Sequence, residues 1–337
     1  MEPLSVYGIG NPLIDVLADV QDLELERLSL QRGTMQLIDE DTGRRILESL
    51  GDRDRTYASG GSCPNTMNTL AALNVAAAAA GCIGDDELGA IYLRRLVEDG
   101  VVSSLTQVDA STGTSIVLIT PDGERTMSTC LGACRLFTPA AVDHELVAAA
   151  QMLYFTGYMW DTETQKQAVV DAIRTAHRND TTVVFDVADP MAVKRYRDDF
   201  LLLIREETDV LLANLEEARM LEGNEELSAA EAARGLSRDC AVVAVKDGAR
   251  GSSVGADGAT SDVGAPTVDA VDTTGAGDAY AAGFICGLLR GDLPRDAAGL
   301  ATEVASRIVQ QRGAQFRGSA RRTEYNNQHR REYEYSS

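Results

Sequence analysis

The chain of 337 residues lacks most features that mark membrane and secreted proteins. It contains no uninterrupted apolar run of 18 residues, so the sequence predicts no membrane-spanning helix. Its first residues lack the basic region of a signal peptide and continue into a strand-like apolar run, which predicts a cytoplasmic protein. The six cysteines include no Cys-x-x-Cys pair, so we expect buried free thiols and neither a zinc site nor a disulfide framework.

Positive charge is also scarce. The 52 Asp and Glu residues outnumber the 31 Lys and Arg residues, and only Lys166, Lys194 and Lys246 are lysines. A net charge of −21 argues against a nucleic-acid partner, because phosphate binding requires basic side chains. The acidity can serve solubility alone or suit concentrated salt, and the composition is compatible with both. We therefore expect a small-molecule partner and no membrane or nucleic acid.

The order of the predicted elements indicates an α/β fold. Strands and helices alternate through strand 150–157, helix 162–179, strand 181–189, helix 196–207, strand 208–214 and helix 215–223. Such alternation predicts a mostly parallel sheet with helices on both faces. The segments 11–40 and 107–135 are rich in hairpin patterns, so we expect them to form a small separate sheet, such as a lid. We expect one domain over residues 1–316 and a polar, flexible tail over 317–337.

A glycine turn with a carboxylate on each side is the strongest chemical signal. DTTGAGDAYAAGF (272–284) places Asp272 before the turn and Asp278 after it, where an apolar helix begins. The backbone N–H groups of Gly275, Ala276 and Gly277 would form an anion hole at the helix N-terminus. Asp278 in the first turn could act as a base toward a hydroxyl. The alternative is an ordinary glycine turn followed by an N-terminal helix residue.

Two better-known phosphate-binding patterns do not fit. A Walker A loop needs a lysine after its second glycine, and the segment 272–284 contains none. GIGNPL (8–13) follows a strand as a dinucleotide fingerprint does, but Leu13 replaces its third glycine and the next segment is strand-like.

Three motifs together resemble the ribokinase-like (PfkB) carbohydrate and nucleoside kinases. They are GGSCPNTMNTLAALN (60–74), ANLEEA (213–218) and VDTTGAGDAYAAGF (271–284), in the order of that family. The similarity extends over about residues 4–316, and the chain is most similar to the adenosine kinases through GIGNPLIDV (8–16), GERTMSTCLGAC (123–134) and FTGYMWD (155–161). The resemblance implies a ribokinase-like, Rossmann-like core with a β-sheet lid. It also implies transfer of the γ-phosphoryl group of ATP, with Mg²⁺, to a primary hydroxyl.

The resemblance further implies roles for individual residues. Asp278 is the base, Gly275, Ala276 and Gly277 form the anion hole, and Arg125 meets the transferring phosphate from the lid, although it could be a solvated hairpin charge. The implied acceptor residues are Asn11, Leu13, Asp15, Gly61, Ser62, Asn65 and Tyr158. Among these, Asp15 and Asn65 hold sugar hydroxyls, while Leu13 and Tyr158 sandwich a base. The implied ATP residues are Lys246, Gly248, Gly251, Thr274 and Gly277, with the turn at 245–252 bordering adenine and ribose.

Cations are implied at two places. Asn214 and Glu217 would organise Mg²⁺ through waters, although a helix cap explains Asn214 equally well. Asp272 lies where the family often places a monovalent cation such as K⁺.

The expected function is an ATP-dependent nucleoside kinase of purine salvage, with adenosine as the preferred acceptor, acting as a monomer or homodimer. The alternatives are a sugar kinase of the same family, for ribose, fructose or a keto-sugar acid, and a non-catalytic nucleoside- or sugar-binding protein. A sugar-phosphate acceptor is disfavoured because residues 1–165 contain no lysine. Cys63 and Pro64 depart from the family pattern and leave the acceptor open.

Overall fold

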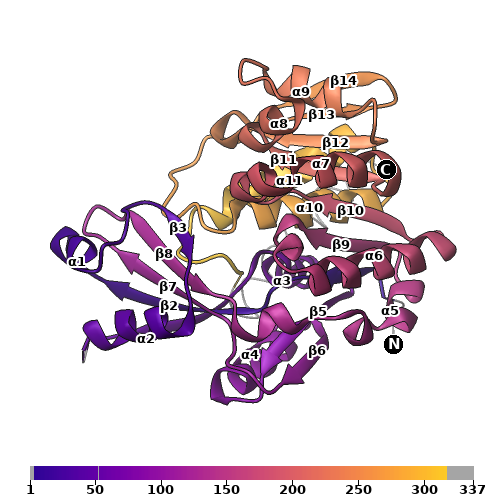
Figure 1. Ribbon diagram of the computed structural model, residues 1–337. Coiled ribbons are helices and arrows are strands. Elements are labelled where there is room, and N and C mark those ends of the chain that lie inside the picture. Colours follow the sequence, from indigo (N-terminus) through magenta and orange to yellow (C-terminus); the bar gives the residue numbers. More distant parts are fainter. Residues whose placement is uncertain (1–3, 52, 317–337) are drawn as a thin grey trace.

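A computed structural model describes residues 4–51 and 53–316 and contains two sheets (Figure 1). The large sheet has nine strands in the order β14-β13-β12-β11-β10-β9-β1-β5-β6. Its strands are β14 (Ala259–Val263), β13 (Ser252–Ala256), β12 (Val242–Lys246), β11 (Val210–Asn214), β10 (Thr182–Asp186), β9 (Met152–Thr156), β1 (Val6–Ile9), β5 (Ala77–Gly84) and β6 (Val102–Val108). The strands from β12 to β6 pair in parallel, while β13 pairs antiparallel with both of its neighbours, β12 and β14. The predicted α/β fold with a mostly parallel sheet is confirmed.

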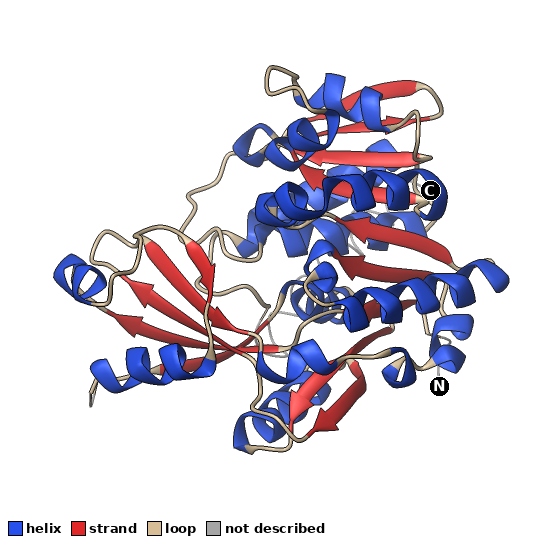
Figure 2. Ribbon diagram, in the orientation of Figure 1, coloured by secondary structure: helices blue, strands red, loops and turns tan. Residues whose placement is uncertain are grey.

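Helices cover both faces of this sheet, as Figure 2 shows. One buried apolar cluster joins the sheet to α5 (His144–Ala149), α6 (Glu163–Arg178), α7 (Pro190–Glu207), α8 (Leu215–Glu222) and α9 (Ala229–Leu236). A second joins it to α3 (Ser62–Ala72), α4 (Glu87–Glu98), α10 (Ala276–Leu289) and α11 (Pro294–Ile308). The sequence of β5, AAAAGCIG, is buried throughout because both of its faces are covered.

The small sheet lies to one side of the large one (Figure 1). Its order is β3-β8-β7-β2-β4, and we call it the lid. The strands are β3 (Met35–Leu37), β8 (Arg125–Cys130), β7 (Thr114–Ile119), β2 (Leu13–Asp19) and β4 (Thr56–Gly60). Helices α1 (Asp22–Arg27) and α2 (Glu40–Ser49) cover one lid face through a third apolar cluster. The opposite face of the lid sheet lines a cavity.

The element predictions fail in identifiable places. The lid also includes β4, which lies outside the two predicted segments. This strand was not predicted because its sequence, TYASG, is short and half exposed. Strand β6, VSSLTQV, was missed because it is a polar edge strand. Helix α7 begins at Pro190, earlier than predicted, and contains a kink at Tyr196. The predicted tail over 317–337 lies outside the described residues.

Four short 3₁₀ helices complete the fold, at Gly132–Leu136, Pro139–Ala141, Gly157–Trp160 and Gly248–Arg250. Within the ranges 4–51 and 53–316, no helix is both long and apolar enough to span a bilayer. The carboxyl ends of parallel strands lie at one edge of a sheet, which is where ligands bind in open α/β folds. This edge faces the lid.

Candidate active site

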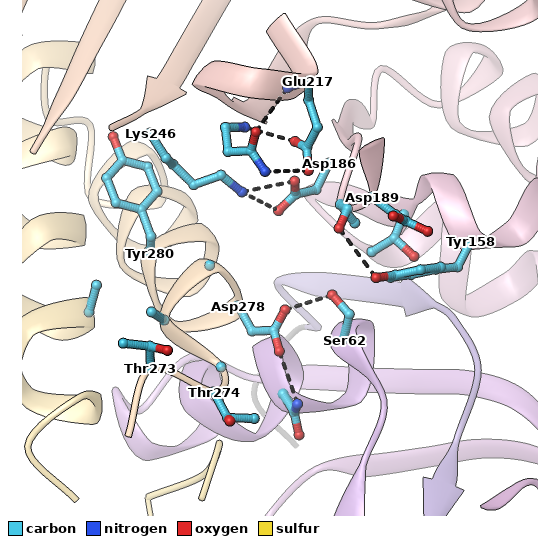
Figure 3. A pocket seen from close by; sticks show the side chains of 18 of the residues that line it. Ser62, Tyr158, Asp186, Asp189, Glu217, Lys246, Thr273, Thr274, Asp278 and Tyr280 are labelled. Carbon is cyan, nitrogen blue, oxygen red and sulfur yellow. Dashed lines mark hydrogen bonds and ion pairs between the residues drawn. The ribbon is translucent and has the colours of Figure 1, made fainter. Parts of the chain in front are cut away.

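A cavity of about 770 Å³ lies between the lid and the carboxyl ends of the central strands. It brings together residues that the sequence placed far apart, and Figure 3 shows part of its lining. The predicted site residues that line it are Asn11, Leu13, Asp15, Gly61, Ser62, Asn65, Tyr158, Asn214, Glu217, Lys246, Gly248, Gly251, Thr274, Gly275, Ala276, Gly277 and Asp278. Arg125 and Asp272 are predicted residues that do not line this cavity.

Asp278 occupies the first turn of α10 and is held by two residues from the start of α3. The hydroxyl of Ser62 donates a hydrogen bond of 2.6 Å to one carboxylate oxygen, and the amide of Asn65 donates one of 2.9 Å to the other (Figure 3). The glycine motif at 60–74 and the glycine turn at 272–284 thus meet at this carboxylate. The sequence predicted both motifs but not their direct contact.

Burial in this cavity sets the acidity of Asp278. Loss of solvent raises its pKa to about 6, while the hydrogen bonds from Ser62 and Asn65 oppose that rise. The nearby Asp186 carboxylate adds to the rise and Lys246 opposes it. At neutral pH the carboxylate is therefore ionised and has a pKa suited to accepting a proton from a hydroxyl.

The turn before α10 requires glycine at its N-cap. Gly275 has φ of 77°, and a Cβ there would lie 2.6 Å from the Cβ of Ala314. One of the three predicted N–H donors is already used, because Ala276 donates to the carbonyl of Thr273 at 3.2 Å. The N–H groups of Gly275 and Gly277 have no acceptor among the described residues. The predicted anion hole is therefore corrected to these two donors.

The space in front of Gly277 is open. A Cβ on Gly277 would meet only the Lys246 ammonium nitrogen, at 3.7 Å. Lys246 ends β12, and its ammonium lies 3.0 and 3.1 Å from the two carboxylate oxygens of Asp186 at the end of β10 (Figure 3). The ammonium end of Lys246 therefore faces the glycine turn, and its predicted role in ATP binding stays a prediction. Asp186 was not predicted from the sequence, although it is a carboxylate at the carboxyl end of a buried strand.

Asn214 and Glu217 form the helix cap that the sequence left as an alternative to a metal site. The Asn214 side chain accepts from the Glu217 N–H at 2.9 Å, while the Asn214 amide groups donate to both Glu217 carboxylate oxygens at 2.6 and 2.7 Å. Burial raises the pKa of Glu217 to about 7, and Lys246 opposes that rise. No cluster of three or more metal-ligating side chains occurs in residues 4–51 and 53–316.

On the lid side, Asp15 lies against the glycine motif. A Cβ on Gly60 would lie 2.6 Å from both Asp15 carboxylate oxygens, and one on Gly61, where φ is 97°, would lie 2.1 Å from the Asn11 carbonyl oxygen. Both glycines therefore permit close packing of the two strands that carry the predicted acceptor residues. Burial raises the pKa of Asp15 to about 7, which the charge of Arg125 partly offsets.

The remaining acceptor wall is largely apolar. The lid contributes the predicted Leu13 and the unpredicted apolar residues Met35, Leu37 and Met127, and Leu131 follows directly after β8. The polar side chains of Ser115 and Thr129 also line this wall. Opposite them, the Tyr158 hydroxyl donates to the Ala188 carbonyl at 3.3 Å, which fixes the ring at the cavity wall (Figure 3). Alternation along the lid strands could have revealed the methionines once the strand pairing was known.

Arg125 joins the lid to the loop before the glycine turn. Its guanidinium donates to the Asp272 carboxylate at 2.5 Å and to the Thr274 hydroxyl at 2.6 Å. Asp272 also accepts from the N–H groups of Gly313 at 2.8 Å and Thr274 at 3.0 Å. The carboxylate predicted to hold a monovalent cation is therefore compensated by an arginine here.

Comparisons with known proteins agree with this geometry. The family model described as pfkB family carbohydrate kinase matches residues 35–320. The ATP-dependent ribose-1-phosphate kinase of Halopiger xanaduensis is 32% identical over 74% of this chain and 81% of its own. The adenosine kinase of Saccharomyces cerevisiae is 30% identical over 86% of this chain and 89% of its own. The crystal structure of adenosine kinase from Sinorhizobium meliloti superposes with a TM-score of 0.89 at 34% identity, covering 97% of this chain and 99% of that one.

Proposed function

Since the chain belongs to the pfkB family of carbohydrate kinases, we propose that it transfers the γ-phosphoryl group of ATP to the primary 5′ hydroxyl of a nucleoside, with adenosine as the preferred acceptor. The observation that carries the proposal is the Asp278 carboxylate, held by Ser62 and Asn65 beside the free N–H groups of the glycine turn. Phosphoryl transfer needs this combination of a base and charge stabilisation in one dry cavity.

The chain's own groups account for the chemical step. Asp278 accepts the proton of the acceptor hydroxyl as its oxygen forms a bond to the γ-phosphorus and the bond to the bridging oxygen of ADP breaks. The N–H groups of Gly275 and Gly277 face the charge that develops on the transferring group. On the lid side, the Asp15 carboxylate can accept hydrogen bonds from two neighbouring ribose hydroxyls.

Magnesium fits this site only in hydrated form. Asn214 donors already occupy both oxygens of Glu217, so the remaining lone pairs suit the waters of a hydrated ion. Glu217 would hold such an ion. Bound there, Mg²⁺ would neutralise phosphate charge on ATP.

A nucleoside suits the acceptor side because most side chains of the cavity wall beyond Asp15 are apolar. Leu13, Met127, Leu131 and Tyr158 offer contacts to a flat base that a free sugar does not possess. Adenosine kinases are also among the similar proteins at 30% and 34% identity. These observations support adenosine over a free sugar.

A phosphorylated sugar is the second candidate acceptor, and one residue favours it. Arg195 lines the cavity together with Asp189, whose carboxylate its charge influences. A guanidinium carries five N–H donors, so it can also bind an anionic group on the acceptor. One relative is a ribose-1-phosphate kinase, an enzyme named for such an acceptor.

An acceptor panel tests the proposal. Purified protein is incubated with MgATP and adenosine, cytidine, guanosine, ribose, fructose or ribose 1-phosphate, and ADP release and product mass are measured. We expect adenosine to give the highest kcat/KM, with a product heavier by one phosphoryl group. Turnover of ribose 1-phosphate that exceeds turnover of every nucleoside, and that Arg195→Ala removes, would establish the second candidate in its place.

A further inference from the structure

We propose that Lys246 is a catalytic residue that contacts the transferring phosphoryl group, and that Asp186 is the positioning residue that holds it there. The inference rests on the proposed phosphoryl transfer and adds a cation to the two N–H donors of the glycine turn. The family resemblance counted Lys246 among the ATP residues through the turn at 245–252, but it assigned the lysine no contact with the transferring group.

The location of the ammonium group carries the inference. Lys246 belongs to β12 and the glycine turn precedes α10, yet the ammonium nitrogen lies 3.7 Å from the position of a Cβ on Gly277. The free N–H of Gly277 is on the same turn. An anion bound by this turn would therefore lie within reach of Lys246 (Figure 3).

Asp186 fixes the lysine in this position. Both of its carboxylate oxygens accept from the ammonium group, at 3.0 and 3.1 Å, and one of them also accepts from the Tyr154 hydroxyl at 3.4 Å. The Asp186 side chain is only 2% exposed, so this anchor is rigid. A lysine has four side-chain torsions, and fixing them in advance removes an entropic cost from the reaction.

The lysine retains capacity for another partner. An ammonium group carries three N–H donors, and Asp186 is the only acceptor that takes hydrogen bonds from Lys246 in the described ranges. Its surroundings are acidic, because Glu217 and Asp278 act on it in addition to Asp186, and these charges raise its pKa against the effect of burial. The group therefore stays protonated at neutral pH and presents a charge toward the open space.

The proposed role needs no proton transfer by Lys246. The acceptor oxygen forms the new bond to phosphorus, the bond to the ADP oxygen breaks, and Asp278 takes the proton. Lys246 keeps its proton throughout and stabilises negative charge on the oxygens of the transferring group. A purely structural reading assigns Lys246 only the neutralisation of buried Asp186.

Paired substitutions separate the two readings. We expect Lys246→Met to lower kcat about 100- to 1000-fold, the usual loss for one transition-state donor. The same variant leaves Asp186 unpaired and should lower the melting temperature. In Lys246→Met/Asp186→Asn the uncompensated charge is gone, so we expect the melting temperature to recover while kcat stays low. A double variant with kcat within about threefold of wild type would overturn the proposal.

A binding measurement adds a second readout that does not depend on turnover. Calorimetry gives the ratio of affinities for ADP and for a non-hydrolysable ATP analogue, which differ by the γ-phosphoryl group. We expect Lys246→Met to weaken the analogue at least about tenfold more than ADP. An unchanged ratio would contradict contact with the γ-phosphoryl group.

The positioning role of Asp186 has its own test. In Asp186→Asn the lysine keeps its charge but loses its anchor, so we expect a lower kcat with little change in ADP affinity. Asp186→Glu should restore part of kcat, whereas an Asp186→Asn variant with wild-type kcat would refute positioning. Phosphoryl transfer by wild type that Asp278→Asn abolishes would leave the proposed function standing even if every Lys246 prediction failed.

Discussion

The guanidinium of Arg125 lies 2.5 Å from a carboxylate oxygen of Asp272, although 147 residues separate them. One residue belongs to lid strand β8 and the other to the loop before the glycine turn. Because Arg125 also donates to Thr274, it connects the lid to two of the three residues that precede Gly275. We therefore expect the position of the lid and the geometry of the glycine turn to be coupled.

We expect Arg125→Ala to loosen this coupling. The ion pair is largely buried, with exposures of 22% and 5%, so its loss should cost about 1–3 kcal/mol in the free energy of unfolding. The acceptor KM should rise about tenfold, because the lid carries Asp15 and Leu13. Arg32→Ala is the matched control, since it removes lid ion pairs that are exposed to solvent. Equal effects in the two variants, in urea titrations and in KM, would contradict the coupling.

The activity should have an acid limb set by Asp278. Its pKa is raised to about 6, so the fraction of ionised base declines as the pH falls below that value. We expect kcat/KM to fall about tenfold per pH unit below this point. The measurement is a pH–rate profile from pH 4.5 to 8 under conditions where the fold persists. A flat profile down to pH 5 would be incompatible with Asp278 as the base.

Stability should respond to pH in the opposite direction. Asp15 has an ordinary pKa of 3.8 that folding raises to about 7, so between these values the native state binds more protons than the unfolded chain. The uptake of a proton by Asp15 therefore stabilises the native state at low pH. This contribution of Asp15 to the free energy of unfolding is lost as the pH rises from about 4 to 7. We expect Asp15→Asn to flatten that decline in urea titrations, relative to wild type. A parallel pH dependence in the two proteins would disprove the raised pKa.

The two glycines of the turn should separate stability from activity. Gly275→Ala places a Cβ against Ala314 at positive φ, and we expect a loss of about 1–3 kcal/mol. In Gly277→Ala the methyl group has room, because only Lys246 is within 4 Å, but it enters the space in front of the turn. We expect a normal melting temperature and kcat reduced about 100-fold. Full activity in a folded Gly277→Ala variant would show that no reacting group occupies this space.

The sequence predicted features that depend on neighbouring residues better than features that depend on how distant elements meet. The turn before α10 and the place of Asp278 in its first helical turn follow from local glycine and helix chemistry. The contact of Arg125 with Asp272, and the direction of Lys246 toward Gly277, required the order of the strands and the position of the lid. The Asn214 cap was a true ambiguity, because the same residues suit a helix start and hydrated magnesium.

The most direct test of the central claim is transfer from ATP to adenosine by wild type, Asp278→Asn and Asp198→Asn. Asp198 is a matched control because its side chain is 99% exposed and lies outside the cavity. We predict that wild type and Asp198→Asn form 5′-AMP at equal rates, while Asp278→Asn retains the fold and loses at least about 1000-fold in kcat. Equal rates of AMP formation by a folded Asp278→Asn protein and wild type would contradict the account.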